Sequence, residues 1–160
     1  MVYQSTNRDK LNEALQLCKI HSDRMSFAWG KIEKHFPLTQ DKYLHLLPEE
    51  LSFIDQLIFR FSKLQDSMGD KLFNAILENL GEDVRGKPFF DKLTKLEELK
   101  IINRADEWII LRETRNIVTQ EYPFKIEDII EGLNLLSKHY QLIMKIWKQV
   151  EAFTQNRFQE

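Results

Sequence analysis

The hydrophobic positions along the chain recur at steps of three and four almost throughout, which is the period of an amphipathic α-helix. The first stripe predicts a helix that begins after an N-cap at Thr6 or Asn7 and ends before Pro37. Its apolar positions are Leu11, Ala14, Leu15, Cys18, Met25, Trp29 and Ile32. The range 36–47 lacks this pattern and is predicted to be a connector. No strand-like alternation of apolar and polar residues and no internal repeat occurs in the sequence.

The most regular stripe predicts a long second helix from Pro48 to about Gly81. Proline is favoured at the first position of a helix, and the acidic Glu49 and Glu50 that follow interact favourably with the helix dipole. Gly69 lies inside this helix, where it would permit a close helix crossing or a slight bend. Gly81 is expected to cap the C-terminal end.

Three more helices complete the predicted fold. A short helix opens at Pro88, a fourth helix covers about 106–119, and a long last helix covers about 126–153. The whole chain, 1–160, is therefore expected to be a single all-α domain. Its expected architecture is an up-and-down antiparallel bundle of four main helices plus a short one.

Composition and charge exclude several classes of protein. The chain has 160 residues, of which 42% are hydrophobic, and only 5 glycines and 4 prolines. A Rossmann fold, a P-loop nucleotidase or a β-sandwich would normally use more of both in turns. The net charge of -2 argues against a broad basic surface that coats nucleic acid without regard to sequence. A local basic site remains compatible with it.

The single cysteine limits the metal and redox chemistry. Cys18 alone cannot form an internal disulfide or a cysteine-rich zinc site. Cys18 and His21 are three residues apart and could ligate a metal, but Cys18 lies on the apolar stripe, which favours core packing. We expect no metal and no cofactor. The polar range 1–10 does not look like a signal peptide, and no apolar stretch is long enough for a membrane span, so we expect a cytoplasmic protein without a membrane partner.

The fourth predicted helix departs from the simple pattern. At 100° per residue, one face that could dock on the bundle holds Ile110, Leu111, Thr114, Ile117 and Val118. The opposite face gathers Trp108, Arg112, Arg115, Asn116 and Thr119. One interpretation is a solvated face on which Arg112 stacks on Trp108. The other is an anion site, because arginine forks match phosphate oxygens and an indole offers a plane for base stacking.

Polar residues outside the apolar stripe of the second helix could meet this face. Asp66 or Arg60 could contact the fourth helix and orient Arg115, although a structural ion pair is the simpler expectation. His139 of the last helix is expected to be a surface or packing residue.

The segment 115–123 carries a motif, with the sequence RNIVTQEYP. It resembles the signature of the HEPN superfamily, and more narrowly that of its HepT-like branch, Arg-Asn-x-x-x-His-x-Tyr, often ending in Glu-Tyr-Pro. Arg115, Asn116, Glu121, Tyr122 and Pro123 match in place, and the preceding residues 108–112 also resemble the family. The specific resemblance covers 108–123, and the rest is agreement of helical layout. At the position of the family's histidine this chain has glutamine.

The resemblance implies a toxin of a toxin–antitoxin pair. Such proteins are metal-independent endoribonucleases that act on RNA as homodimers, with two copies of the motif facing each other across a cleft. On that basis Arg115 would bind the scissile phosphate, Asn116 would position it, and Arg112 would add positive field. Trp108 and Thr119 would lie beside them in the phosphate-binding site.

The resemblance also implies a minimal nucleotidyltransferase as the antitoxin partner, with Tyr122 as the acceptor of an adenylyl group. Gln120 stands in the catalytic position but cannot exchange a proton near neutral pH. Loss of a general acid or base typically removes about 10²–10⁴ in rate, so impaired RNA cleavage with retained binding at Arg112 and Arg115 is expected. The alternative is a non-catalytic nucleotide-binding or interaction module that presents Tyr122 to the nucleotidyltransferase.

Overall fold

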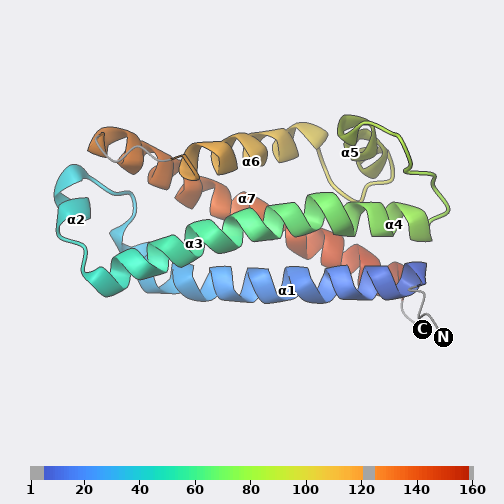
Figure 1. The fold of residues 1–160 in the computed structure, drawn as a ribbon, viewed down its shortest axis with the longest axis horizontal. Coiled ribbons are helices and arrows are strands. Elements are labelled where there is room, and N and C mark those ends of the chain that lie inside the picture. The colour runs from blue at the N-terminus through green and yellow to red at the C-terminus, as the bar shows by residue number, and fades with distance from the viewer. Residues whose placement is uncertain (1–5, 121–124, 159–160) are drawn as a thin grey trace.

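The computed structural model describes residues 6–120 and 125–158, and within those ranges every regular element is a helix. The elements are α1 (Asn7–Ile32), η1 (Glu33–His35), α2 (Gln40–Leu44), α3 (Pro48–Ser67), η2 (Met68–Leu72), α4 (Phe73–Asn79), α5 (Phe89–Glu98), α6 (Ala105–Val118) and α7 (Ile126–Phe158). The long helices α1, α3, α6 and α7 alternate in direction, and the short α5 lies beside the start of α6 (Figure 1). The predicted all-α class is confirmed for the described residues.

The helix ends follow the local sequence signals. The Thr6 hydroxyl accepts a hydrogen bond from the Asp9 N–H at 3.0 Å, and the Asp9 carboxylate accepts one from the Thr6 N–H at 3.2 Å. This reciprocal cap confirms the predicted start of α1. Pro48 is the first residue of α3, as predicted. The predicted connector 36–47 contains the short helix α2, which Thr39 caps.

The predicted second helix is continuous but not uniform. It consists of α3, the π-helical turn η2 and α4, and η2 holds the buried Gly69. A Cβ atom at Gly69 would lie 3.5 Å from the Trp108 side chain and 3.6 Å from the Phe89 side chain. These are ordinary van der Waals distances, so Gly69 lies in close packing with α5 and α6 but a Cβ atom would fit there. Gly81 has φ +84°, a conformation that suits glycine at a helix C-terminus.

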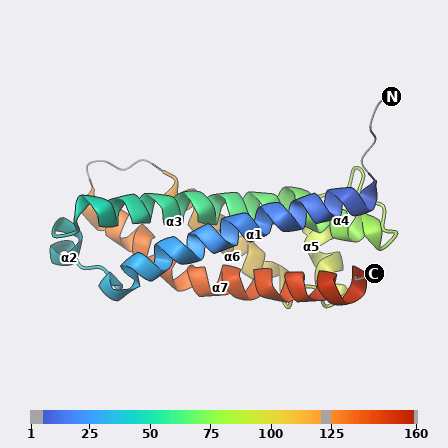
Figure 2. The ribbon, with the colours of Figure 1, turned by 90° about the horizontal axis from the view of Figure 1, so that it is seen from below.

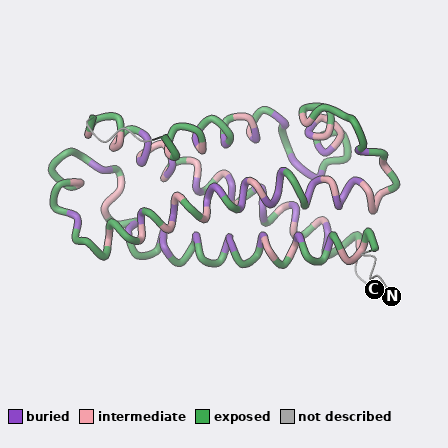
Figure 3. Tube along the Cα trace, in the orientation of Figure 1, coloured by how far each residue is buried: buried purple, intermediate pink, exposed green. Residues whose placement is uncertain are grey.

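The core runs along the inward faces of the long helices (Figure 3). The rings of Trp29 and Tyr140 stack at 5.0 Å and join α1 to α7, and Phe73 packs edge-on against Trp108 at 4.8 Å. Cys18 is fully buried, which confirms its predicted core position. Within the described residues, no helix is both long enough and apolar enough to cross a membrane.

The orientation of α6 differs from the prediction. Its buried positions are Ala105, Trp108, Leu111 and Thr114, whereas Ile110 and Ile117 are 39% and 41% exposed. The face of α6 that packs on the bundle is therefore rotated about the helix axis relative to the predicted face. The large indole of Trp108 packs into the core against Phe73, and this burial turns the two isoleucines outward.

Candidate anion-binding site

A pocket of about 330 Å³ lies between α6 and the junction of α3 with η2. Helix α6 contributes Trp108, Arg112, Arg115 and Asn116. The α3–η2 junction contributes Gln65, Asp66, Gly69 and Asp70, and Phe89 of α5 completes the lining. Five of the candidate residues named from the sequence, the four on α6 and Asp66 on α3, thus line one pocket.

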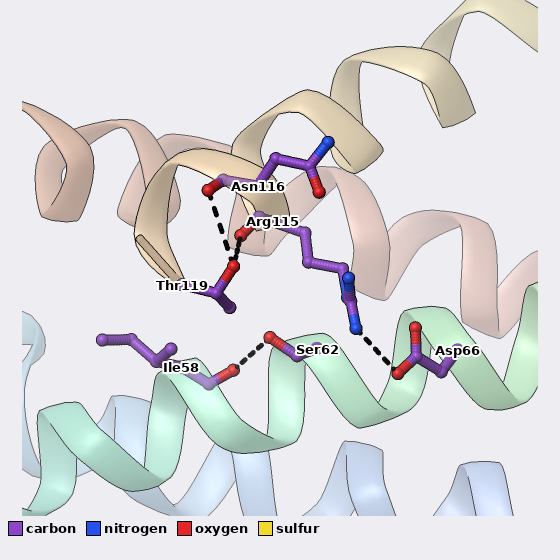
Figure 4. Close-up of polar contacts among 6 residues, drawn as sticks. All are labelled: Ile58, Ser62, Asp66, Arg115, Asn116 and Thr119. Atoms are coloured by element: carbon purple, nitrogen blue, oxygen red, sulfur yellow. Dashed lines mark hydrogen bonds and ion pairs between the residues drawn. The ribbon is translucent and has the colours of Figure 1, made fainter. Parts of the chain in front are cut away.

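Arg115 reaches across to α3. Its Nη2 group donates to Oδ2 of Asp66 at 3.0 Å, and the two side chains are 34% and 40% exposed (Figure 4). The predicted contact of Asp66 with α6 is confirmed. Arg60, the other candidate, turns away and donates to Nδ1 of His21 at 2.9 Å. The Nε atom of Arg115 is buried and has no hydrogen-bond partner.

Arg112 is exposed and forms no ion pair with a carboxylate among the residues the structure describes. Its guanidinium carbon lies 5.1 Å from the centroid of the Phe89 ring, which is a cation–π contact. The expected stacking of Arg112 on Trp108 is wrong, because Phe89 takes that place. Trp108 is only 1% exposed, so it cannot offer a free plane to a base.

Asn116 and Thr119 lie at the C-terminal end of α6. The Asn116 amide points away from the Arg115–Asp66 pair (Figure 4), although Asn116 lines the pocket. The Thr119 hydroxyl donates to the Arg115 carbonyl at 2.8 Å. Thr119 is not a lining residue of the pocket, so its contribution is to the end of the helix.

Gln65 forms part of the buried side of the pocket and was not singled out from the sequence. It is 3% exposed, and neither its amide nitrogen nor its amide oxygen has a hydrogen-bond partner. Leaving such a group unpaired costs about 1–3 kcal/mol, so it calls for an explanation. The signal in the sequence was a polar residue in helical register with Phe61 and Met68. The adjoining π-helical turn is itself a feature that often marks functional sites.

Gln120 lies elsewhere. It borders a separate pocket of about 140 Å³ between α3, α6 and α7, whose lining shares no residue with the arginine pocket. Within one chain the structure therefore does not bring position 120 to the pocket of Arg112 and Arg115. Tyr122, the expected modification site, is in the range 121–124, outside the described residues.

Family models, curated proteins and solved structures were compared with the chain, and none matches. The site is therefore interpreted from its own chemistry. The pocket holds two arginines and two aspartates, and one of each is engaged in the Arg115–Asp66 pair. That leaves Arg112 and Asp70 as the lining charges without an ion pair among the described residues, and the exposed guanidinium of Arg112 is a group that can bind a phosphate oxygen.

The remaining titratable candidates are packing residues. The Nδ1 atom of His139 lies 2.6 Å from the buried Thr114 hydroxyl, and its pKa is lowered by burial and then by Lys138. Burial raises the pKa of the Cys18 thiol to about 12, which disfavours the thiolate that a metal would need. Among the described residues, no group of three or more histidines, cysteines or acidic residues could hold a metal ion.

Proposed function

We propose that this chain is a HepT-like, HEPN-type RNA-binding protein that holds an RNA phosphate in the pocket of Arg112 and Arg115. In this proposal it acts as the toxin component of a toxin–antitoxin pair, forms a homodimer and pairs with a minimal nucleotidyltransferase in the cytoplasm. Its RNA cleavage is impaired because Gln120 stands where the motif has histidine. The family, the dimer and the partner rest on the resemblance of residues 108–123.

One structural observation carries the binding part of the proposal. The guanidinium of Arg112, which has no ion-pair partner among the described residues, and that of Arg115, which pairs with Asp66, line the same pocket of about 330 Å³. Gln65 also lines this pocket, and its buried amide has no hydrogen-bond partner. An entering phosphate would accept charge-assisted hydrogen bonds from the guanidinium groups of Arg112 and Arg115.

The chemistry at Gln120 follows from its side chain. Metal-free RNA cleavage needs proton transfer at the 2′-hydroxyl and at the leaving oxygen, and a histidine side chain can supply it near pH 7. A glutamine amide can hydrogen-bond but cannot transfer a proton. Position 120 borders a different pocket from the arginines. In the proposal, the dimer brings the two motifs face to face, and this arrangement would place position 120 and the arginines around the same RNA.

The test compares three proteins with single-stranded RNA in the presence of a chelator: the wild-type chain, Gln120→His and Gln120→His/Arg115→Ala. We expect weak or no cleavage by the wild type, cleavage by Gln120→His, and loss of cleavage in the double variant. A folded, dimeric Gln120→His protein that does not cut would refute the nuclease part.

Binding is tested separately with Arg112→Ala/Arg115→Ala, measured by fluorescence anisotropy of a labelled RNA. We expect this variant to lose affinity, and unchanged affinity would refute the binding part. If the wild type neither binds nor cuts RNA but gains the mass of an adenylate from a nucleotidyltransferase and ATP, the interaction-module alternative is favoured. Tyr122→Phe should then abolish the mass gain.

A further inference from the structure

Four cationic side chains lie near enough to the buried imidazole of His21, where α1 packs on α3, for their charges to lower its pKa. This basic cluster consists of Arg24 from α1, Arg60 and Lys63 from α3, and Lys71 from η2. The two helices lie side by side in both views (Figures 1 and 2). Arg60 is fixed by its 2.9 Å hydrogen bond to Nδ1 of His21. The pKa of His21 is lowered by burial first and then by each of the four cations, so the imidazole adds no charge of its own at neutral pH.

The basic cluster is also distinguished by its lack of ion pairs within the described residues. None of its four members forms an ion pair with a carboxylate in the parts of the chain that the structure describes. Lys19 on α1, by contrast, pairs with Asp23 at 3.5 Å. Unpaired like charges held close together repel one another, and a bound polyanion relieves that repulsion.

An aromatic ring lies at the edge of the cluster. Phe59 of α3 is 50% exposed, with the Arg60 guanidinium 5.1 Å and the Lys63 ammonium 5.6 Å from its ring centroid. Cations beside an exposed aromatic ring are the arrangement that proteins use for single-stranded nucleic acids, in which bases stack and phosphates pair with the cations. An acidic peptide would use the cations but not the ring.

The cluster is close to the arginine pocket. Phe59 precedes Asp66, the partner of Arg115, by seven residues on α3, which corresponds to about 10 Å along the helix. Asp66 and Asp70 are the acidic residues on the pocket side of α3 and η2. A strand held by a phosphate in the pocket can therefore reach the cluster across the solvent-exposed side of α3.

We infer that the basic cluster and Phe59 form a second contact for single-stranded RNA, whose backbone crosses α3 between the arginine pocket and α1. This inference rests on the proposed function, because it describes the path that the same RNA takes over the protein surface. The phosphates pair with Arg24, Lys63 and Lys71, and one base stacks on Phe59. The pocket alone would hold a dinucleotide, whereas a longer strand would use both contacts.

The test measures affinity for a labelled single-stranded RNA of about 12 nucleotides and for a dinucleotide. The charge reversal Arg24→Glu/Lys63→Glu alters exposed residues of the cluster, and Lys145→Glu/Lys148→Glu on α7 is a control with the same change in net charge. We expect the cluster variant to bind the longer RNA at least about tenfold more weakly, with a salt slope reduced by about 1.4 for two lost phosphate contacts. The dinucleotide should lose far less affinity, and the control variant should lose little for either ligand.

Phe59→Ala is an independent variant, expected to weaken binding of the longer RNA about fivefold or more. A cluster variant that binds the longer RNA like the control overturns the inference. The inference is also overturned if polyglutamate displaces the labelled RNA as effectively as unlabelled RNA does. The proposed function still stands in those cases if Arg112→Ala/Arg115→Ala loses binding. If only the cluster variant loses binding, the cluster is supported and the pocket is not. A wild type that binds no RNA overturns both.

Discussion

The Arg115–Asp66 pair leads to a prediction about how the charge of Asp66 affects phosphate binding in the pocket. Asp66→Asn keeps an oxygen that can accept from Nη2 of Arg115, so the guanidinium should stay in place. The substitution removes one negative charge from the pocket lining. A bound phosphate would therefore meet less repulsion and would no longer compete with a carboxylate for Arg115.

The size of this effect follows from simple electrostatics. A carboxylate and a phosphate about 6 Å apart repel each other by about 1 kcal/mol at an effective dielectric constant of roughly 50. The half-exposed Arg115–Asp66 pair itself is worth less than about 1 kcal/mol. We therefore expect Asp66→Asn to bind a short single-stranded RNA about five- to tenfold more tightly, with a change in unfolding free energy below about 1 kcal/mol.

The assay is fluorescence anisotropy at constant ionic strength, with stability followed by urea denaturation. Asp106→Asn is the matched control, because Asp106 is an exposed aspartate at the start of α6 that pairs with Arg104 outside the pocket. Asp66→Asn should gain affinity and Asp106→Asn should not. Equal affinities in the two variants, or weaker binding by Asp66→Asn, would refute the idea that Asp66 competes with the phosphate.

Three further predictions concern the fold. Gly30 is exposed near the end of α1 and an added Cβ would meet nothing within 4 Å, so Gly30→Ala should raise the unfolding free energy by about 0.5–1 kcal/mol in urea denaturation. The pKa of Cys18 is raised by burial from 9.0 to about 12, so the thiol should react with a disulfide reagent only after unfolding. Stability should also fall as the pH rises above 9.0, less steeply in Cys18→Ala. The pKa values of His21 and His139 are lowered from 6.5, mainly by burial, so the unfolded chain binds more protons in acid. The unfolding free energy should therefore fall as the pH drops below 6.5, and His21→Gln/His139→Gln should lose part of that dependence.

Local signals in the sequence predicted the helix ends because the atoms that form a cap are close along the chain. Thr6 with Asp9, and Pro48 at the start of α3, needed no knowledge of distant residues. The π-helical turn was not predictable in the same way. It lies where Gly69 meets side chains of α5 and α6, and those contacts depend on the packing of three helices.

The candidate site was predicted in part. The sequence placed Arg112, Arg115 and Asn116 on one helix and offered Asp66 as a partner, which the structure brings together around one pocket. The helical wheel of α6 placed Trp108 on the outer face, which is wrong. The wheel counted the number of apolar residues on each face and gave an indole no more weight than an isoleucine. An indole buries more surface, and Trp108 lies in the core.

Side-chain NMR of the arginine Nε–H groups and of the glutamine amides during titration with a short single-stranded RNA tests the central claim most directly. The account predicts that the signals of Arg112, Arg115 and Gln65 shift with one common affinity, while that of Arg157 at the far end of α7 stays in place. RNA binding that leaves the Arg112 and Arg115 signals unmoved would contradict the account.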